Sequence, residues 1–199
     1  MALDNRKEAL ERVAFNMGMK YLPKDEWGQY RLLKDFRLFR RGRHRRITNL
    51  LIKRDESLEL TLNVFDYRFV IGGGNHHRRI KQTVFFIESK KLGLPDFLMK
   101  PEKLFHKLGE YLGMQDIDFE AFPDFSNQYL LQGDDEDYIR SVLGKPDFLR
   151  FFTTEKNWSL EGSNYYLIFY RRKKILAPAE IQNFVEKGMK IFKILKVND

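Results

Sequence analysis

Strict alternation of apolar and polar residues is the feature that most limits what this chain can fold into. Between positions 58 and 64 the apolar residues are Leu58, Leu60, Leu62 and Val64, and the residues between them are polar. Successive side chains of a β-strand point to opposite faces of its sheet, so the pattern predicts a strand with one buried face and one face in water. A wet face is typical of antiparallel sheets, and residues 58–71 therefore predict an antiparallel sheet in this half of the chain.

Further strand-like segments surround this one. Residues 47–54 precede it across a turn of Asp55, Glu56 and Ser57, and residues 81–89 follow it after a glycine-rich loop at 72–74. A shorter strand is expected at residues 36–39. These segments together predict a meander of three or four strands.

Helical spacing appears at both ends of the chain and in its second half. Helices are expected near residues 4–18 and 102–113, and from the acidic cluster 134–137 through Val142. After an interruption at Gly144 and Pro146, a second short helix is expected through Phe152, and a last helix begins at Pro178. A strand is expected at 125–133 and a hairpin at 157–172. The order predicts an α+β fold, with helices packed against a mostly antiparallel sheet. We expect a single domain over 1–199, or two packed halves at 1–115 and 116–199.

Composition excludes several classes of protein. The chain has 199 residues, 43% of them hydrophobic and 15% aromatic, and it contains no cysteine. A chain of this length buries a large core without covalent links, and disulfide frameworks, thiolate zinc sites and cysteine nucleophiles all require the missing residue. Charges throughout residues 1–13 argue against a secretion signal, and the longest apolar run, 165–170, is too short to span a membrane. We therefore expect a cytoplasmic protein.

Positive charge is concentrated in one segment. The whole chain has 36 Lys and Arg against 28 Asp and Glu, a net charge of +8. Residues 31–54 contain ten basic residues and one acid, Asp35, for a net charge of +9, so the rest of the chain sums to −1. Two smaller basic groups lie at 78–81 and 171–174. If the strands form a meander, the segment around Gly42 and the glycine-rich loop lie at the same end of the sheet.

Such a cluster would attract a polyanion through release of counterions, and arginine pairs well with phosphate. The candidate polyanion-binding residues are Arg37, Arg40, Arg41, Arg43, Arg45, Arg46, Arg78, Arg79 and Lys81. The aromatic residues Tyr30, Phe39, Tyr67 and Phe69 are near enough in sequence to stack on unpaired bases. The sequence contains no helix-turn-helix, ribonucleoprotein or zinc-finger pattern. The alternative interpretation is therefore a solvated basic turn between two strands, facing an acidic protein or an anionic lipid surface.

No catalytic residue, metal ligand or cofactor is assigned. The loop 72–74 lacks the spacing of a phosphate-binding cradle, and the adjacent His76 and His77 point to opposite sides of an extended chain. Asp116, Asp118 and Glu120 would share one face of a strand and could hold Mg²⁺, which leaves a metal-dependent hydrolase as a third alternative.

Aromatic and turn motifs over residues 30–195 resemble an uncharacterised family of bacterial proteins, a domain of unknown function. The motifs are FRLFRRGRHRRITNLL, VFDYRFVIGGG, LPDFLMKPE and DIDFEAFPDFSNQYLLQGDDED, followed by a hydrophobic helix. The resemblance implies a bacterial cytoplasmic setting and this order of elements, and it implies no activity, cofactor or catalytic residue. The sequence thus predicts a non-catalytic binding or scaffolding protein, with a binder of nucleic acid or an anionic surface through residues 31–54 as the alternative.

Overall fold

A computed structural model describes residues 2–26, 28–73, 76–102 and 116–197. The helices are α1 (Ala2–Asn16), α2 (Gln29–Leu33), α3 (Arg37–Arg40), α4 (Pro123–Ser126), α5 (Glu136–Leu143), α6 (Pro146–Thr154) and α7 (Ile181–Leu195), the last preceded by a 3-10 turn at Pro178–Glu180. The strands are β1 (Lys20–Lys24), β2 (Arg43–Asp55), β3 (Leu60–Ile71), β4 (Arg78–Ser89), β5 (Leu94–Pro101), β6 (Tyr129–Gly133), β7 (Ser159–Asn164) and β8 (Tyr166–Tyr170).

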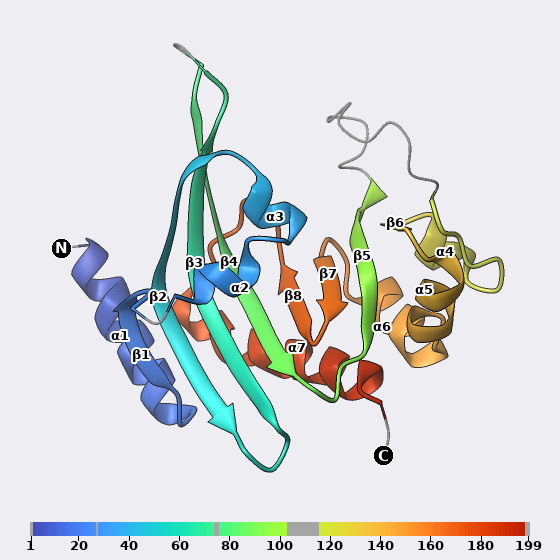
Figure 1. The fold of residues 1–199 in the computed structure, drawn as a ribbon. Helices are drawn as coiled ribbons and strands as arrows, with labels where there is room; N and C mark the ends of the chain where they lie inside the picture. Colours follow the sequence, from blue (N-terminus) through green and yellow to red (C-terminus); the bar gives the residue numbers. More distant parts are fainter. Residues whose placement is uncertain (1, 27, 74–75, 103–115, 198–199) are drawn as a thin grey trace.

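All eight of these strands join one sheet in the order β1-β2-β3-β4-β8-β7-β5-β6, and every pairing is antiparallel (Figure 1). The predicted α+β class is confirmed. The hairpin β7–β8 lies between β4 and β5, so two strands from the end of the sequence separate the first four strands from the pair β5–β6.

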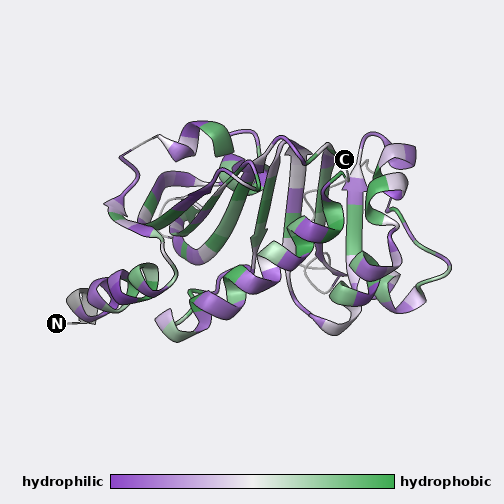
Figure 2. Cartoon of the chain, turned by 90° about the horizontal axis from the view of Figure 1, so that it is seen from below, coloured by the Kyte–Doolittle hydropathy of each residue, from purple (hydrophilic) through white to green (hydrophobic). Residues whose placement is uncertain are grey.

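Helices cover both faces of this sheet. On the face here called the α7 face, α1, α7 and the helices α4 to α6 bury one large hydrophobic cluster that includes Leu10, Phe85 and Phe184. On the opposite face, called the α3 face, the α2–α3 segment buries a second cluster around Phe39 and Phe86. Figure 2 shows α1 and α7 along one side of the sheet and hydrophobic residues on the strands between the layers.

Cover on two faces corrects the prediction of a wet face on β3. Leu60, Leu62 and Val64 pack into the α7-face cluster as expected. The next residues in the alternation, Phe65 and Tyr67, pack into the α3-face cluster, and Asn63 is fully buried. The wet face was wrong because the α2–α3 segment, which connects β1 to β2, folds back over it.

Two other predicted elements differ in the structure. Residues 36–39, predicted as a strand, belong to the short helix α3, which buries Leu38 and Phe39. The predicted strand at 125–133 is shorter, because Pro123 starts the helical turn α4 and only Tyr129–Gly133 is extended. Strands β1 and β5 were not predicted. The predicted helix at 102–113 lies outside the described residues, apart from Glu102.

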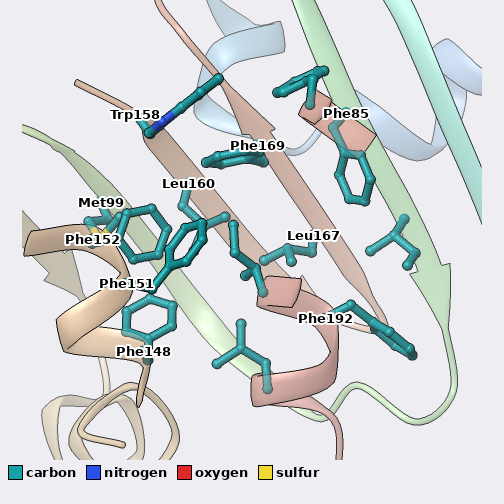
Figure 3. Packing of buried hydrophobic residues seen from close by; sticks show 14 of the residues in the cluster. Phe85, Met99, Phe148, Phe151, Phe152, Trp158, Leu160, Leu167, Phe169 and Phe192 are labelled. Atoms are coloured by element: carbon teal, nitrogen blue, oxygen red, sulfur yellow. The ribbon is translucent and has the colours of Figure 1, made fainter. Parts of the chain in front are cut away.

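Stacked aromatic rings make up the centre of the α7-face cluster (Figure 3). The ring of Trp158 lies 4.3 Å from that of Phe169 and 5.4 Å from that of Phe184, centroid to centroid, in stacked geometry. Helix α7 can approach β4 this closely because position 188 is a glycine; a Cβ there would lie 2.4 Å from the Phe85 ring. Trp158, 3% exposed, is thus a residue of the core.

Helix α1 is joined to the sheet by a partly buried ionic network. The guanidinium of Arg6 donates two hydrogen bonds of 3.0 Å to the Asp66 carboxylate and one of 2.8 Å to the carbonyl of Leu176. Asn49 and Thr83 donate to the same carboxylate at 2.9 Å. The Asp66 carboxylate on β3 therefore connects α1, β2 and β4, and Arg6 and Thr83 extend the network to Leu176 in the segment before α7.

Candidate functional site

The end of the sheet beyond Asp66 brings two of the basic groups together. Arg43 of β2 lies opposite Val70 of β3, and Val70 lies opposite Arg79 of β4. The segment around Gly42 and the glycine-rich loop thus lie at the same end of the sheet, as predicted. In Figure 1 the β3–β4 hairpin projects beyond the rest of the sheet at this end.

Close packing at Gly42 turns the chain from α3 into β2. Its φ is 67°, and a Cβ there would lie 2.4 Å from the carbonyl oxygen of Val70 and 2.7 Å from the Phe69 ring. Only glycine tolerates both the left-handed conformation and this approach. Gly42 therefore sets where Arg43 begins its strand.

A β-bulge in β2 then places two arginines on one face. Arg43 is opposite Val70 and Arg46 is opposite Arg68, so three steps along β2 correspond to two steps along β3. Within the bulge His44 has a φ of 52°, an uncommon conformation for a residue other than glycine. Regular alternation would put Arg43 and Arg46 on opposite faces, whereas the bulge puts both on the α7 face with Arg68.

The result is a row of like charges across three strands. Arg46 lies opposite Arg68, and Arg68 lies opposite Lys81. Like charges directly opposite one another on adjacent strands are destabilising, typically by about 0.2–1 kcal/mol a pair. A neighbouring row adds Arg43 and Arg79 on the two sides of Val70.

Four of these side chains, those of Arg43, Arg46, Arg68 and Arg79, line an open cleft of about 430 Å³, and Lys81 lies next to it, opposite Arg68 on β4. Its lining, here called the arginine cleft, is Arg43, His44, Arg46, Arg68, Phe69, Val70, His77 and Arg79, with no acidic residue. Among the described parts of the chain, no side-chain hydrogen bond or ion pair is found for any of the four arginines. The cleft is therefore a cationic surface without internal neutralisation.

The other candidate residues lie elsewhere. Arg40 is 3.8 Å from Asp35, and Arg45 donates hydrogen bonds to the Tyr30 hydroxyl and to the carbonyls of Arg40 and Arg41, so both serve the local structure. Arg37 and Arg41 line a separate small cavity under α3. Arg78 is exposed beside the cleft, opposite Ile71.

Sequence reasoning missed three residues of the cleft, His44, Arg68 and His77. Arg68 had a signal, since it continues the even-numbered face of the alternation that begins at Leu60. The bulge that carries His44 had none, because its extra residue depends on the close approach at Gly42.

The expected stacking platform for unpaired bases was wrong. Phe39 and Tyr67 are fully buried and Phe69 is 4% exposed. Tyr67 lies between the rings of Phe39 and Phe69, at 4.3 and 5.4 Å. These rings form the α3-face core and are not available to a base.

The small cavity under α3 contains the most perturbed acid. Glu161 of β7 is 2% exposed, and its carboxylate accepts hydrogen bonds from the backbone N–H groups of Arg37 (2.6 Å) and Leu38 (3.2 Å) and from the Tyr170 hydroxyl (2.9 Å). Burial raises the pKa of Glu161 to about 7, against the opposing effect of these hydrogen bonds. Glu161 thus binds the start of α3 to the middle of the sheet.

The third basic group, 171–174, lies beside β4. The backbone N–H of Lys173 donates to the Gln82 side chain at 3.1 Å, and the N–H of Thr83 donates to the carbonyl of Lys174 at 2.9 Å. Arg172 also lines the cavity under α3.

The acidic residues considered for Mg²⁺ do not share a strand face. Residues 116–119 are not part of a strand, and one Asp116 oxygen accepts the backbone N–H of Leu131 at 2.8 Å. Burial raises the pKa of Asp116. Across the described residues, no group of three or more His, Cys, Asp or Glu side chains could hold a metal ion.

None of the helices in the described residues is long and apolar enough to cross a membrane.

No family model and no curated protein matches this chain. Among solved structures, it resembles the crystal structure of the mycobacterial trehalose monomycolate transport factor A, TtfA, with a TM-score of 0.65 and 11% sequence identity over 97% of this chain and 98% of that chain. This whole-length likeness supports, at the level of fold, the resemblance carried by the aromatic and turn motifs. A likeness at this identity shows a common fold, while ligands depend on sites that differ between proteins of one fold.

Proposed function

We propose that this protein is a non-catalytic binding module that holds a polyanion, one presenting several phosphate groups, in the arginine cleft. The observation that carries the proposal is the row formed by Arg46, Arg68 and Lys81, which places three cations opposite one another without a carboxylate between them. Such an arrangement costs stability in the free protein, and a bound anion would remove the repulsion. The structural neighbour is described as a transport factor, which is compatible with a role in binding.

The burial of Phe39, Tyr67 and Phe69 favours recognition of phosphates over recognition of bases. Binding of single strands relies on aromatic side chains that stack with bases, and the cleft exposes four arginines and two histidines but no Phe, Tyr or Trp ring. A ligand that displays phosphates on an ordered surface, such as a duplex or an anionic membrane, fits this chemistry better than a single strand.

Retention on immobilised heparin tests the proposal. We expect the protein to be retained at low salt, and the triple variant Arg46→Glu, Arg68→Glu and Arg79→Glu to lose retention. The matched control, Arg12→Glu, Lys90→Glu and Lys193→Glu, makes the same change of net charge at exposed positions outside the cleft, and should remain bound. Equal losses in both triple variants would show that net charge, and not the cleft, determines binding.

Competition with soluble ligands defines the ligand class. Duplex DNA and vesicles containing about one-third phosphatidylserine should displace heparin from the protein, while a single strand of equal phosphate content should have no advantage over the duplex. A strong preference for the single strand would contradict recognition through phosphates alone.

A further inference from the structure

The small cavity under α3 is distinct from the arginine cleft and lies over the middle of the sheet. It is lined from α3 and the residues after it and from strands β3, β4, β5, β7 and β8. Its volume is about 30 Å³. That volume has room for one or two particles the size of a water molecule, and tetrahedral oxyanions are too large for it.

Positive charge dominates the lining. The charged residues are Arg37, Arg41, Lys100 and Arg172 against one acid, Glu161. The Glu161 carboxylate already accepts hydrogen bonds from α3 and from Tyr170. Burial lowers the pKa of Lys100, and repulsion by Arg41, Arg172 and Arg37 lowers it further against the opposing attraction of Glu102, so the cations of this cavity act on one another.

Gln82 contributes a buried donor to the same cavity. Its side-chain oxygen accepts the backbone N–H of Lys173 at 3.1 Å, and an N–H can only donate, which fixes which end of the amide is oxygen. The side-chain NH₂ group of Gln82 is then buried, and no hydrogen-bond partner for it is found among the described residues. Gln82 is 0% exposed, so bulk water does not satisfy this donor. An unsatisfied buried donor in a cavity whose lining carries four cations and one acid calls for an acceptor with negative charge.

We propose that this cavity binds a small monatomic anion of the size of chloride, held by the NH₂ group of Gln82 and the surrounding cations. The anion connects the sheet to Arg37 and Arg41 on the α3 segment, beside the contact that Glu161 makes with the same helix. This site is independent of the polyanion proposed for the arginine cleft.

Thermal unfolding at constant ionic strength tests the site. Replacing gluconate with chloride or bromide should raise the melting temperature of the full chain in a saturating manner, by about 5 °C when the anion is at a hundred times its dissociation constant. Sulfate at equal ionic strength should give no saturating rise. The triple variant of the arginine cleft should keep the chloride effect, which separates this site from the proposed function.

The variant Gln82→Glu replaces the buried NH₂ group with a carboxylate oxygen of almost the same size. The built-in charge should take the place of the anion, so this variant should lose the response to chloride. The control Asn183→Asp makes a comparable amide-to-carboxylate change at an exposed position on α7 and should keep the response.

Bromide in crystals of the unaltered protein provides a readout that does not depend on folding of a variant. An anomalous peak beside Gln82 and Lys100 is the expected result. The absence of that peak, a melting temperature that does not respond to chloride, or a full response in Gln82→Glu would each overturn the proposal.

Discussion

Individual residues of this protein carry interactions that lower its stability. Arg68 faces Arg46 on one side and Lys81 on the other, and Glu161 is a carboxylate buried under α3. Arrangements of this kind persist where a ligand or a specific conformation offsets their cost. Two predictions at this scale separate these costs.

Arg68→Gln should stabilise the free protein while weakening its binding. Removing the middle charge of the row relieves two repulsive pairs, which we expect to raise the free energy of unfolding by about 0.5–1 kcal/mol at low salt. The gain should shrink at high salt because screening already weakens the repulsion. Chemical denaturation at two salt concentrations measures it. A loss of stability at low salt would contradict the account of the row.

Glu161→Gln should remove a pH dependence of folding. The pKa of Glu161 rises from 4.5 to about 7 on folding, so the folded state favours the protonated acid. The stabilisation that protonated Glu161 gives to the folded state is complete below about pH 4.5 and is lost as the pH rises through 7. The free energy of unfolding should therefore fall by about 3 kcal/mol over this range.

Denaturation between pH 5 and pH 8 measures this slope. The side chain at position 161 in Glu161→Gln is uncharged at every pH, so this variant should lack the fall in the free energy of unfolding. The control Glu120→Gln, at an exposed position, should keep it. Identical slopes in Glu161→Gln and the unaltered protein would show that the carboxylate does not titrate in this range.

At the scale of elements, the pattern of apolar residues predicted a helix or strand correctly where contacts distant in sequence favour the same conformation. Residues 4–18 were predicted because their apolar residues recur at the period of a helix, and residues 81–89 because a short continuous apolar run is typical of a strand covered on both faces. Residues 36–39 were predicted as a strand but form α3, whose first N–H groups, those of Arg37 and Leu38, donate to Glu161, a residue distant in sequence. Strand β5 was not predicted because Pro95 and Asp96 are residues typical of turns, and only its neighbours β6 and β7 make it a strand.

Helix α1 should loosen from the sheet in Asp66→Ala. The variant leaves the Arg6 guanidinium and the donors of Asn49 and Thr83 without their acceptor, which we expect to cost about 3 kcal/mol.

Hydrogen exchange should show faster exchange of the α1 amides in Asp66→Ala, with smaller changes in β7 and β8. In the double variant with Arg6→Met, part of the lost stability should return, because the uncompensated charge is removed. Unchanged exchange in α1 would contradict the connecting role of the network.

For the whole molecule, the sequence predicted where the charge lies along the chain but not how it is arranged. The count over residues 31–54 located the basic segment, and the meander predicted that it lies near the glycine-rich loop. The bulge at His44 and the contribution of Arg68 depend on register, which the count does not contain. Of the nine candidate residues, three line the cleft directly, namely Arg43, Arg46 and Arg79.

The salt dependence of binding to duplex DNA, used as a phosphate polymer of known charge spacing, tests the central claim most directly. If the five cations of the two rows, Arg43, Arg46, Arg68, Arg79 and Lys81, each neutralise a phosphate, the logarithm of the binding constant should fall with the logarithm of salt concentration with a slope of about −4.5. The triple variant Arg46→Glu, Arg68→Glu and Arg79→Glu should flatten this slope by about three units, and the control Arg12→Glu, Lys90→Glu and Lys193→Glu should leave it unchanged. A slope that is the same in both triple variants, or no binding at low salt, would contradict a polyanion site in the arginine cleft.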